Sequence, residues 1–336
     1  MRRNQLIQHH TLWYDHLENV YYNAEIHNPK DNTTDIKSRY SETRNQPIIS
    51  GKASDYVLSV ERFQIPFSDI PIFEFKDNTY SVSLSFGGND EQTFLIYQNR
   101  DVNPNARAIF EYQHFLDIIN TGFTTCFNDF VTAHGAFPSA TQAPYITYDS
   151  VTKLFTLHVE KAYEADGIQV FMNWPLYTFF QSWEINFNSY GTSPFGEDIE
   201  ILIKDNNNNT DPLDATLYIF PQQLSALYLW FDIQKIVFLT RQIPVQKEYI
   251  SDREETGINK FTTRLIDYTP LINGLERPSE LTFFLQGPRR LIDLKGDDDI
   301  RNLDFEVYWE DKEGRLREIF LNPNDTLSIK LLFMRK

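Results

Sequence analysis

The sequence contains a single cysteine, Cys126, among its 336 residues. No disulfide can form within the chain, so its folding does not depend on an oxidising compartment. Cys126 lies among regularly spaced apolar residues, where a free thiol behaves as a small hydrophobic group. We therefore predict that it packs in a core and does not act as a nucleophile.

Long apolar runs are also lacking. The strongest one, from Leu224 to Phe231, is far too short to cross a bilayer. The first ten residues, MRRNQLIQHH, carry basic side chains but not the apolar region of a secretory signal. We expect no membrane span, and a soluble intracellular setting or a place inside an assembly.

Motifs of known chemistry are missing as well. The chain has no phosphate-binding glycine loop, no nucleophile elbow, and no close metal-ligand spacing among its seven histidines. The stretch from Asp205 resembles a calcium loop but has Thr210 where a glycine is needed and Thr216 where a glutamate is needed. The acidic run 297–299 is typical of a solvated turn. We therefore predict no catalytic, cofactor-binding or metal-binding residues, and a protein that is not an enzyme.

Positive charge is scarce. The chain has 47 acidic and 31 basic residues, which gives a formal net charge of −16. Such a surface repels nucleic acid, because phosphate binding needs clustered lysine and arginine. Basic residues at the two ends are the exception and predict at most weak contact with an acidic partner: Arg2, Arg3, Arg335 and Lys336.

One segment has helical periodicity. Apolar residues between positions 109 and 130 recur in alternating steps of three and four, which places them on one face of an α-helix. These residues are Ile109, Tyr112, Leu116, Ile119, Phe123, Cys126 and Phe130. The pattern predicts a single amphipathic helix of about 33 Å, with His114 on its polar side.

Elsewhere the apolar period is two, which is typical of strands. Predicted strands cover residues 56–60, 80–86, 92–98, 145–148, 153–159, 168–172, 199–203, 215–220, 233–240, 261–268, 282–285, 303–309, 316–321 and 327–333. Many short strands with one long helix predict a mainly β protein, an antiparallel sandwich of jelly-roll or Greek-key type. Residues 246–260 are polar and predict a surface loop.

Residues 1–54 lack the periodicity of a core but are rich in aromatic side chains for a disordered tail. We interpret them as an extended N-terminal arm that docks on its own body or on a neighbouring subunit. If the arm serves assembly, deletion of residues 1–45 leaves a folded body; if it belongs to the core, the deletion unfolds it.

The order of these phrases resembles the penton-type minor capsid proteins of virophages and polinton-like viruses. The resemblance covers roughly residues 40–336 and rests on QHFLDIINTGF (113–123), PYITYDSVTKLFTLHV (144–159), IVFLTRQIPVQKEY (236–249) and FEVYWEDKEGRLREIFLNPNDTLSIKLLF (305–333). It implies a jelly-roll subunit that forms a pentamer at the five-fold vertices of an icosahedral capsid. On this interpretation residues 55–159 and 231–336 form the jelly-roll body, and residues 160–230 form an inserted β domain.

The resemblance implies the virion as location and the major capsid protein as partner, with a host receptor or glycan as a further one. Two other functions stay open: a major capsid or cement protein, for which a trimer is expected, and a glycan-binding attachment module. The last would use surface tryptophans such as Trp174 or Trp183. A jelly-roll hydrolase is the remaining alternative, and no residue in the sequence identifies its site.

Overall fold

The computed structural model describes residues 19–98, 107–186, 194–250, 260–270 and 279–336. The chain forms two compact units. Among the described residues, unit 1 comprises 19–70, 233–250, 260–270 and 279–336, and unit 2 comprises 71–98, 107–186 and 194–232. The chain therefore leaves unit 1 after Ile70, builds unit 2, and returns to unit 1 at Ile233.

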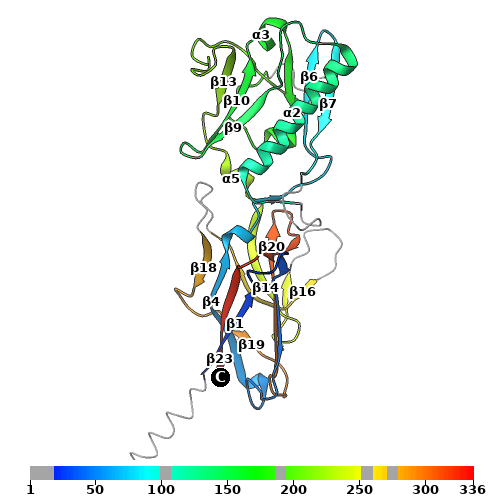
Figure 1. The fold of residues 1–336 in the computed structure, drawn as a ribbon. Helices are drawn as coiled ribbons and strands as arrows, with labels where there is room; N and C mark the ends of the chain where they lie inside the picture. Colours follow the sequence, from blue (N-terminus) through cyan, green and yellow to red (C-terminus); the bar gives the residue numbers. More distant parts are fainter. Residues whose placement is uncertain (1–18, 99–106, 187–193, 251–259, 271–278) are drawn as a thin grey trace, which may run out of the picture. The chain divides into compact units, whose positions relative to one another are not determined.

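The first sheet of unit 1 is antiparallel and has the strand order β1-β23-β4-β18, with β19 also paired to β4. Its strands come from both ends of the described chain (Figure 1): β1 (Asn19–His27), β4 (Tyr56–Pro66), β18 (Glu280–Phe284), β19 (Ile292–Asp293) and β23 (Thr326–Arg335).

The second sheet has the order β17-β14-β20-β21, and β3 pairs with β20. Its strands are β3 (Arg39–Thr43), β14 (Ile233–Leu239), β17 (Arg264–Tyr268), β20 (Asn302–Asp311) and β21 (Leu316–Glu318). Two short ladders complete the unit, made by β2 (Ile36–Lys37) with β22 (Phe320–Leu321) and by β15 (Glu248–Ile250) with β16 (Lys260–Thr262).

The two sheets pack face to face. The Phe63 ring on β4 lies 4.9 Å from Phe238 on β14 and 5.4 Å from Tyr268 on β17, measured between ring centroids. Along β20 every second residue is apolar and buried, because successive side chains of a strand point to opposite faces. These residues are Leu303, Phe305, Val307 and Trp309. Unit 1 is thus the antiparallel jelly-roll sandwich that the sequence predicts.

Unit 2 places a helix against two sheets. α2 (Tyr112–His134) contacts β6 and β7 of a sheet ordered β12-β11-β6-β7, and β9 of a sheet ordered β13-β10-β9. The strands are β6 (Ser81–Phe86), β7 (Asn89–Phe94), β9 (Tyr145–Asp149), β10 (Leu154–Glu160), β11 (Gln169–Met172), β12 (Ile199–Ile201) and β13 (Leu217–Pro221). The remaining elements of the unit are β5 (Phe73–Glu74), β8 (Ala108–Ile109), α3 (Ala162–Asp166), α4 (Trp174–Tyr177) and α5 (Leu227–Trp230).

The predicted helix is present, but two details of it are wrong. Ile109 belongs to β8, where its carbonyl accepts a hydrogen bond from Ile72, so the helix begins three residues later. His114 is buried and not on the polar side of the helix, and its Nε2 lies 2.7 Å from the carbonyl oxygen of Gln98, which satisfies the ring nitrogen. A satisfied histidine can occupy an apolar face.

An amide clamp holds α2 to β9. Asn120 donates from Nδ2 to the Ile146 carbonyl at 2.9 Å, and its Oδ1 accepts from the Ile146 N–H at 2.7 Å. At Gly122 the helix lies so close to Leu95 that an added Cβ would meet the Leu95 Cδ2 at 2.2 Å. These two positions fix how the helix packs.

Aromatic side chains fill the core of unit 2. Trp230 is 1% exposed, lies parallel to Phe155 at 4.8 Å, and donates from Nε1 to the Phe179 carbonyl at 2.9 Å. Parallel and edge-on ring contacts are favourable beyond the area they bury. Much of the aromatic content of this chain therefore serves packing.

The predicted domain boundaries differ from these units. The sequence interpretation assigned residues 55–159 to the body and only 160–230 to an insertion, whereas the compact unit spans 71–232 and includes the helix. The difference arises because β11 pairs with β6, and β10 pairs with both β9 and β13, so segments on each side of residue 160 share sheets.

The predicted N-terminal arm, residues 1–54, is an integral part of unit 1 from residue 19 onward. β1 pairs with β23 along its whole length, and β2 and β3 pair with β22 and β20. Tyr22, Ala24 and Ile26 of β1 are buried in the core. The part of the arm before residue 19 lies outside the described residues.

Two substitutions in β1 test this position. Ile26→Ala should lower the free energy of unfolding of unit 1 by about 2–4 kcal/mol, the usual cost of truncating a buried isoleucine. Glu25→Ala, at the exposed neighbouring position, should change it by about 0.5 kcal/mol or less. Urea unfolding of the full chain measures both, and equal small effects would show that β1 only rests on the surface.

Candidate functional site

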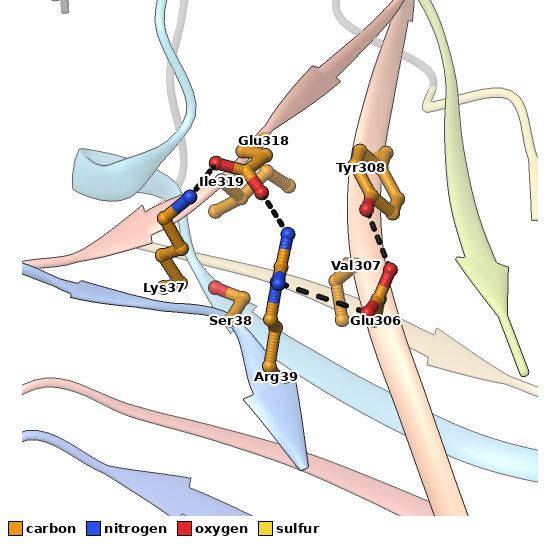
Figure 2. Close-up of a pocket in the computed structure, with 8 residues that line it drawn as sticks. All are labelled: Lys37, Ser38, Arg39, Glu306, Val307, Tyr308, Glu318 and Ile319. Carbon is orange, nitrogen blue, oxygen red and sulfur yellow. Dashed lines mark hydrogen bonds and ion pairs between the residues drawn. The ribbon is translucent and has the colours of Figure 1, made fainter. Parts of the chain in front are cut away.

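An ion-pair cluster covers one surface region of unit 1, where β2, β3, β20 and β21 meet (Figure 2). Lys37 Nζ lies 2.6 Å from Glu318 Oε2, and Arg39 donates to the other oxygen of Glu318. Glu306 is shared as well, by Arg39 at 3.8 Å and by the Tyr308 hydroxyl at 2.6 Å. The cluster forms because strand alternation points these side chains outward from neighbouring strands.

The charges in this cluster support one another. Burial disfavours the ionised form of Glu318, but hydrogen bonds from Lys37 and Arg39 outweigh it and hold the pKa of Glu318 below its usual value. The hydrogen bond to Glu318 raises the pKa of Arg39. Burial, and then the hydrogen bond to Glu306, raises the pKa of Tyr308. Glu318 therefore stays ionised, Arg39 protonated and Tyr308 neutral at neutral pH.

The hollow beside these ion pairs is a shallow depression open to solvent, with no enclosed space for a molecule. Small-molecule sites usually offer roughly 300 Å³ or more. The cationic groups are already paired with carboxylates, so none of them awaits a ligand. The cluster is best understood as a fastening between strands and not as a binding pocket.

Exposed apolar side chains lie on both end strands of the first sheet. Tyr21 on β1 is 51% exposed and Phe284 on β18 is 58% exposed, while their neighbours Tyr22 and Phe283 point into the core. The order β1-β23-β4-β18 places these two rings at opposite ends of one sheet. Surfaces of this kind mark protein contacts when they gather, and single exposed rings are common.

The two tryptophans suggested for glycan binding have different environments. Trp183 is 4% exposed and stacks on Phe180 at 4.7 Å, so its proposal as a surface residue is wrong. Trp174 is 49% exposed at the start of α4, where Asn173 caps the turn by accepting from the Leu176 N–H. Trp174 is thus the one of the pair that solvent reaches.

Within the described part of the chain, no group of three or more His, Cys, Asp or Glu side chains is arranged to hold a metal ion. Cys126 is fully buried, and burial raises the pKa of its thiol to about 12, which suits the predicted packing role. His158 is close to Asp211, at 3.6 Å, yet burial lowers its pKa and keeps the ring neutral.

The two acidic stretches serve loop geometry. In the run 297–299, Asp299 accepts from the Gly51 N–H at 2.6 Å and Asp297 lies 3.5 Å from Lys52 Nζ. In the loop from Asp205, the side chains of Asp205, Asn206 and Asn209 each accept from a backbone N–H two or three residues away, as is usual in turns.

The basic ends have separate environments. Lys336 Nζ is 2.7 Å from the Asp293 carboxylate, so this charge is neutralised within unit 1. Arg2 and Arg3 lie outside the described residues. In the described part of the chain, no helix is both long enough and apolar enough to cross a bilayer.

A comparison with protein families gives a match over residues 20–335 to the family described as Sputnik minor capsid protein V18/19. The chain belongs to this family. The match extends through both units and begins within β1. The protein is therefore a minor capsid protein of virophage type, and its location is the virion capsid.

Individual relatives agree with the family. The chain is 31% identical to structural protein V19 of the Sputnik virophage over 203 residues, which is 56% of this chain and 93% of the relative. A second Sputnik protein, the uncharacterized protein V18, is 29% identical over 120 residues, 27% of this chain and 71% of that one.

Two solved structures share the fold. A chain in the cryo-EM structure of the Sputnik virophage matches with a TM-score of 0.72 and 28% identity, covering 95% of this chain and 98% of that one. The crystal structure of the mavirus penton protein matches with a TM-score of 0.64 and 15% identity, covering 95% of this chain and 100% of that one. Both matches include unit 1 and unit 2 together, since either unit alone is far shorter than 95% of the chain.

Sequence reasoning did not find the ion-pair cluster. Lys37 and Arg39 lie in the presumed arm, and Glu306 and Glu318 lie about 270 residues further along the chain. The pairings of β2 with β22, of β3 with β20 and of β20 with β21 bring them together.

A pH series on Glu318→Gln tests the cluster. Because the pKa of Glu318 is lowered on folding, its contribution is present above the usual glutamate pKa and is lost as the pH falls through the lowered value. The variant should lose about 0.5–1 kcal/mol of unfolding free energy at pH 7, since the side chain is partly exposed. The difference from the wild type should shrink as the pH is lowered from 7 to below the usual glutamate pKa. A loss that is the same at both pH values would mean that packing, not charge, is what the substitution removes.

Proposed function

We propose that this chain is a penton-type capsomer that occupies the five-fold vertices of an icosahedral virophage capsid. The observation that carries the proposal is the full-length likeness to the mavirus penton protein, which includes both units. Membership of a minor capsid family supports the same role, because vertices need far fewer subunits than capsid faces do.

A ring of five subunits needs two different contact surfaces on each subunit, because a cyclic interface is head-to-tail. Unit 1 offers such a pair at the two ends of its first sheet, with Tyr21 on β1 and Phe284 on β18. Aromatic side chains are enriched at the centres of protein interfaces. In this proposal the β18 end of one subunit meets the β1 end of the next.

The major capsid protein is the second proposed partner, because a vertex subunit must contact the surrounding capsomers. The acidic excess of the chain limits indiscriminate association, including association with nucleic acid. Attachment to a host glycan stays a prediction of the sequence, with Trp174 as its candidate residue.

The role is structural and not catalytic in this proposal. Glu318 and Asp311, two acids whose pKa values are lowered, belong to ion pairs and not to a shared cleft. Ion-pair networks of this kind shift pKa values without any catalytic role.

The native mass of the purified full chain tests the oligomeric state. Light scattering after size-exclusion chromatography should give five times the 39.6 kDa of one chain. Three copies would favour a major capsid arrangement, and a single copy at high concentration would contradict a self-assembling vertex.

A second experiment tests the surface. Phe284→Ser should convert pentamers to monomers, because the substitution removes an exposed ring at the proposed contact. Its melting temperature should stay close to that of the wild type. The matched control is Leu213→Ser, at a 95% exposed position of unit 2, which should remain pentameric. If Phe284→Ser assembles normally, the contact lies elsewhere.

A further inference from the structure

Asp69 is a buried carboxylate with incomplete partners. It ends the short turn η2 (Phe67–Asp69), just before unit 2 begins at Pro71, and its side chain is 1% exposed. Its Oδ1 accepts from the backbone N–H of Asn322 at 3.2 Å and from the Asn322 side chain. Its Oδ2 has no hydrogen-bond donor. Leaving a buried polar atom unsatisfied costs about 1–3 kcal/mol.

The other buried acids of unit 1 are better satisfied. Asp304 accepts from Thr240 and from the N–H groups of Arg241 and Gln242. Asp311 accepts a hydrogen bond from the Arg315 guanidinium at 2.9 Å, and Glu310 accepts one from the Arg264 guanidinium at 3.0 Å. Each of these carboxylates has donors or a cation that stabilise its charge. Asp69 differs because its surroundings favour the neutral form.

The charged groups that act on Asp69 are themselves acids. Asp325 lies on the turn between β22 and β23, where its Oδ2 accepts from the hydroxyl of Ser68, the residue before Asp69, at 3.4 Å. Asp35, in the segment before β2, adds a weaker negative charge. Burial first, and then the charge of Asp325, raises the pKa of Asp69 to about 8. Two other titratable groups on the packed elements bond elsewhere: Glu280 on β18 to Gln64, and His27 on β1 to Thr326.

We propose that Asp69 and Asp325 share one proton, and that this proton fastens η2 to the β22–β23 turn. A proton on one carboxyl supplies the donor that the orphaned oxygen lacks, as in other close carboxyl pairs. The same turn is also held to the end of β1, because Asn28 donates to the Asp325 carbonyl at 3.0 Å and accepts from the Asn324 N–H at 2.8 Å. The shared proton and these backbone hydrogen bonds together join three segments of unit 1 that are distant in sequence.

The direction of the pH effect follows from the raised pKa. A carboxyl that holds its proton more tightly in the folded state stabilises that state fully below about pH 4, and the contribution is lost as the pH rises through about 8. The ion pairs of Glu318 and Asp311 have the opposite dependence, since their pKa values are lowered. This end of unit 1 therefore becomes tighter in acid, where the ion-pair clusters weaken.

Hydrogen exchange of the full chain, measured by mass spectrometry in the presence of EDTA, tests the proposal. After correction for the intrinsic rate, peptides covering 66–70 and 320–326 should exchange about tenfold faster at about pH 9 than at about pH 6. Asp69→Asn should abolish this difference, because the amide donates to Asp325 at every pH. Asp297→Asn, at an exposed carboxylate, is the matched control and should behave as the wild type.

Asp325→Asn provides a second variant in case Asp69→Asn does not fold, and it should abolish the same difference. The proposal is overturned if the wild-type peptides show equal protection at both pH values. It is also overturned if the Asn variants keep the full pH dependence. The pentameric state is not involved, so failure here leaves the proposed capsid role intact.

Discussion

Unit 1 depends on the double pairing of β23. This strand has β1 on one edge and β4 on the other, so residues near 20, near 60 and near 330 must meet before the first sheet exists. Its inward residues Leu327, Ile329, Leu331 and Phe333 are all 1% exposed or less. Hydrophobic burial along this strand is what draws the distant segments together. The second sheet, the ion-pair cluster and the Asp69 turn all build on that arrangement.

Unit 2 is built from one continuous stretch of the chain, and a helix rather than a doubly paired strand organises its packing. α2 contacts strands of two sheets, Asn120 fixes it to β9, and Gly122 allows a close approach to Leu95. Trp230 then closes the aromatic core. The two units thus differ in kind: one is closed by distant strand pairing and the other by a helix and its rings.

Local patterns predicted most of the elements. The helix, the hairpin of β9 and β10, and the long strands β20 and β23 follow directly from periods of 3.6 and two. The hairpin of β6 and β7 is tighter than predicted, because Gly87 and Gly88 both adopt positive φ and pair Phe86 with Asn89. Strand β1 was missed even though Tyr22, Ala24 and Ile26 alternate with polar residues, because its surroundings are polar and Ala24 is small.

Long-range organisation could not be predicted in the same way. Nothing near residue 71 or 232 indicates which sheets lie on either side, since the boundary depends on which strands pair. Likewise, the burial of Asp69 follows from a turn some 250 residues away, and a lone aspartate after a strand usually faces solvent. Sequence alone therefore suggests the kind of protein but not the contacts that hold its parts together.

The discontinuity of unit 1 has a consequence for biogenesis. Residues 71–232 are contiguous, so the ribosome releases all of unit 2 before β23 has been translated. Unit 1 at that moment lacks β23, the strand that lies between β1 and β4 in its first sheet, so β1 and β4 have no strand to pair with at that position. Unit 1 of a nascent chain therefore stays incomplete until β23 has been translated through Arg335, and only then can its surfaces take part in capsid assembly.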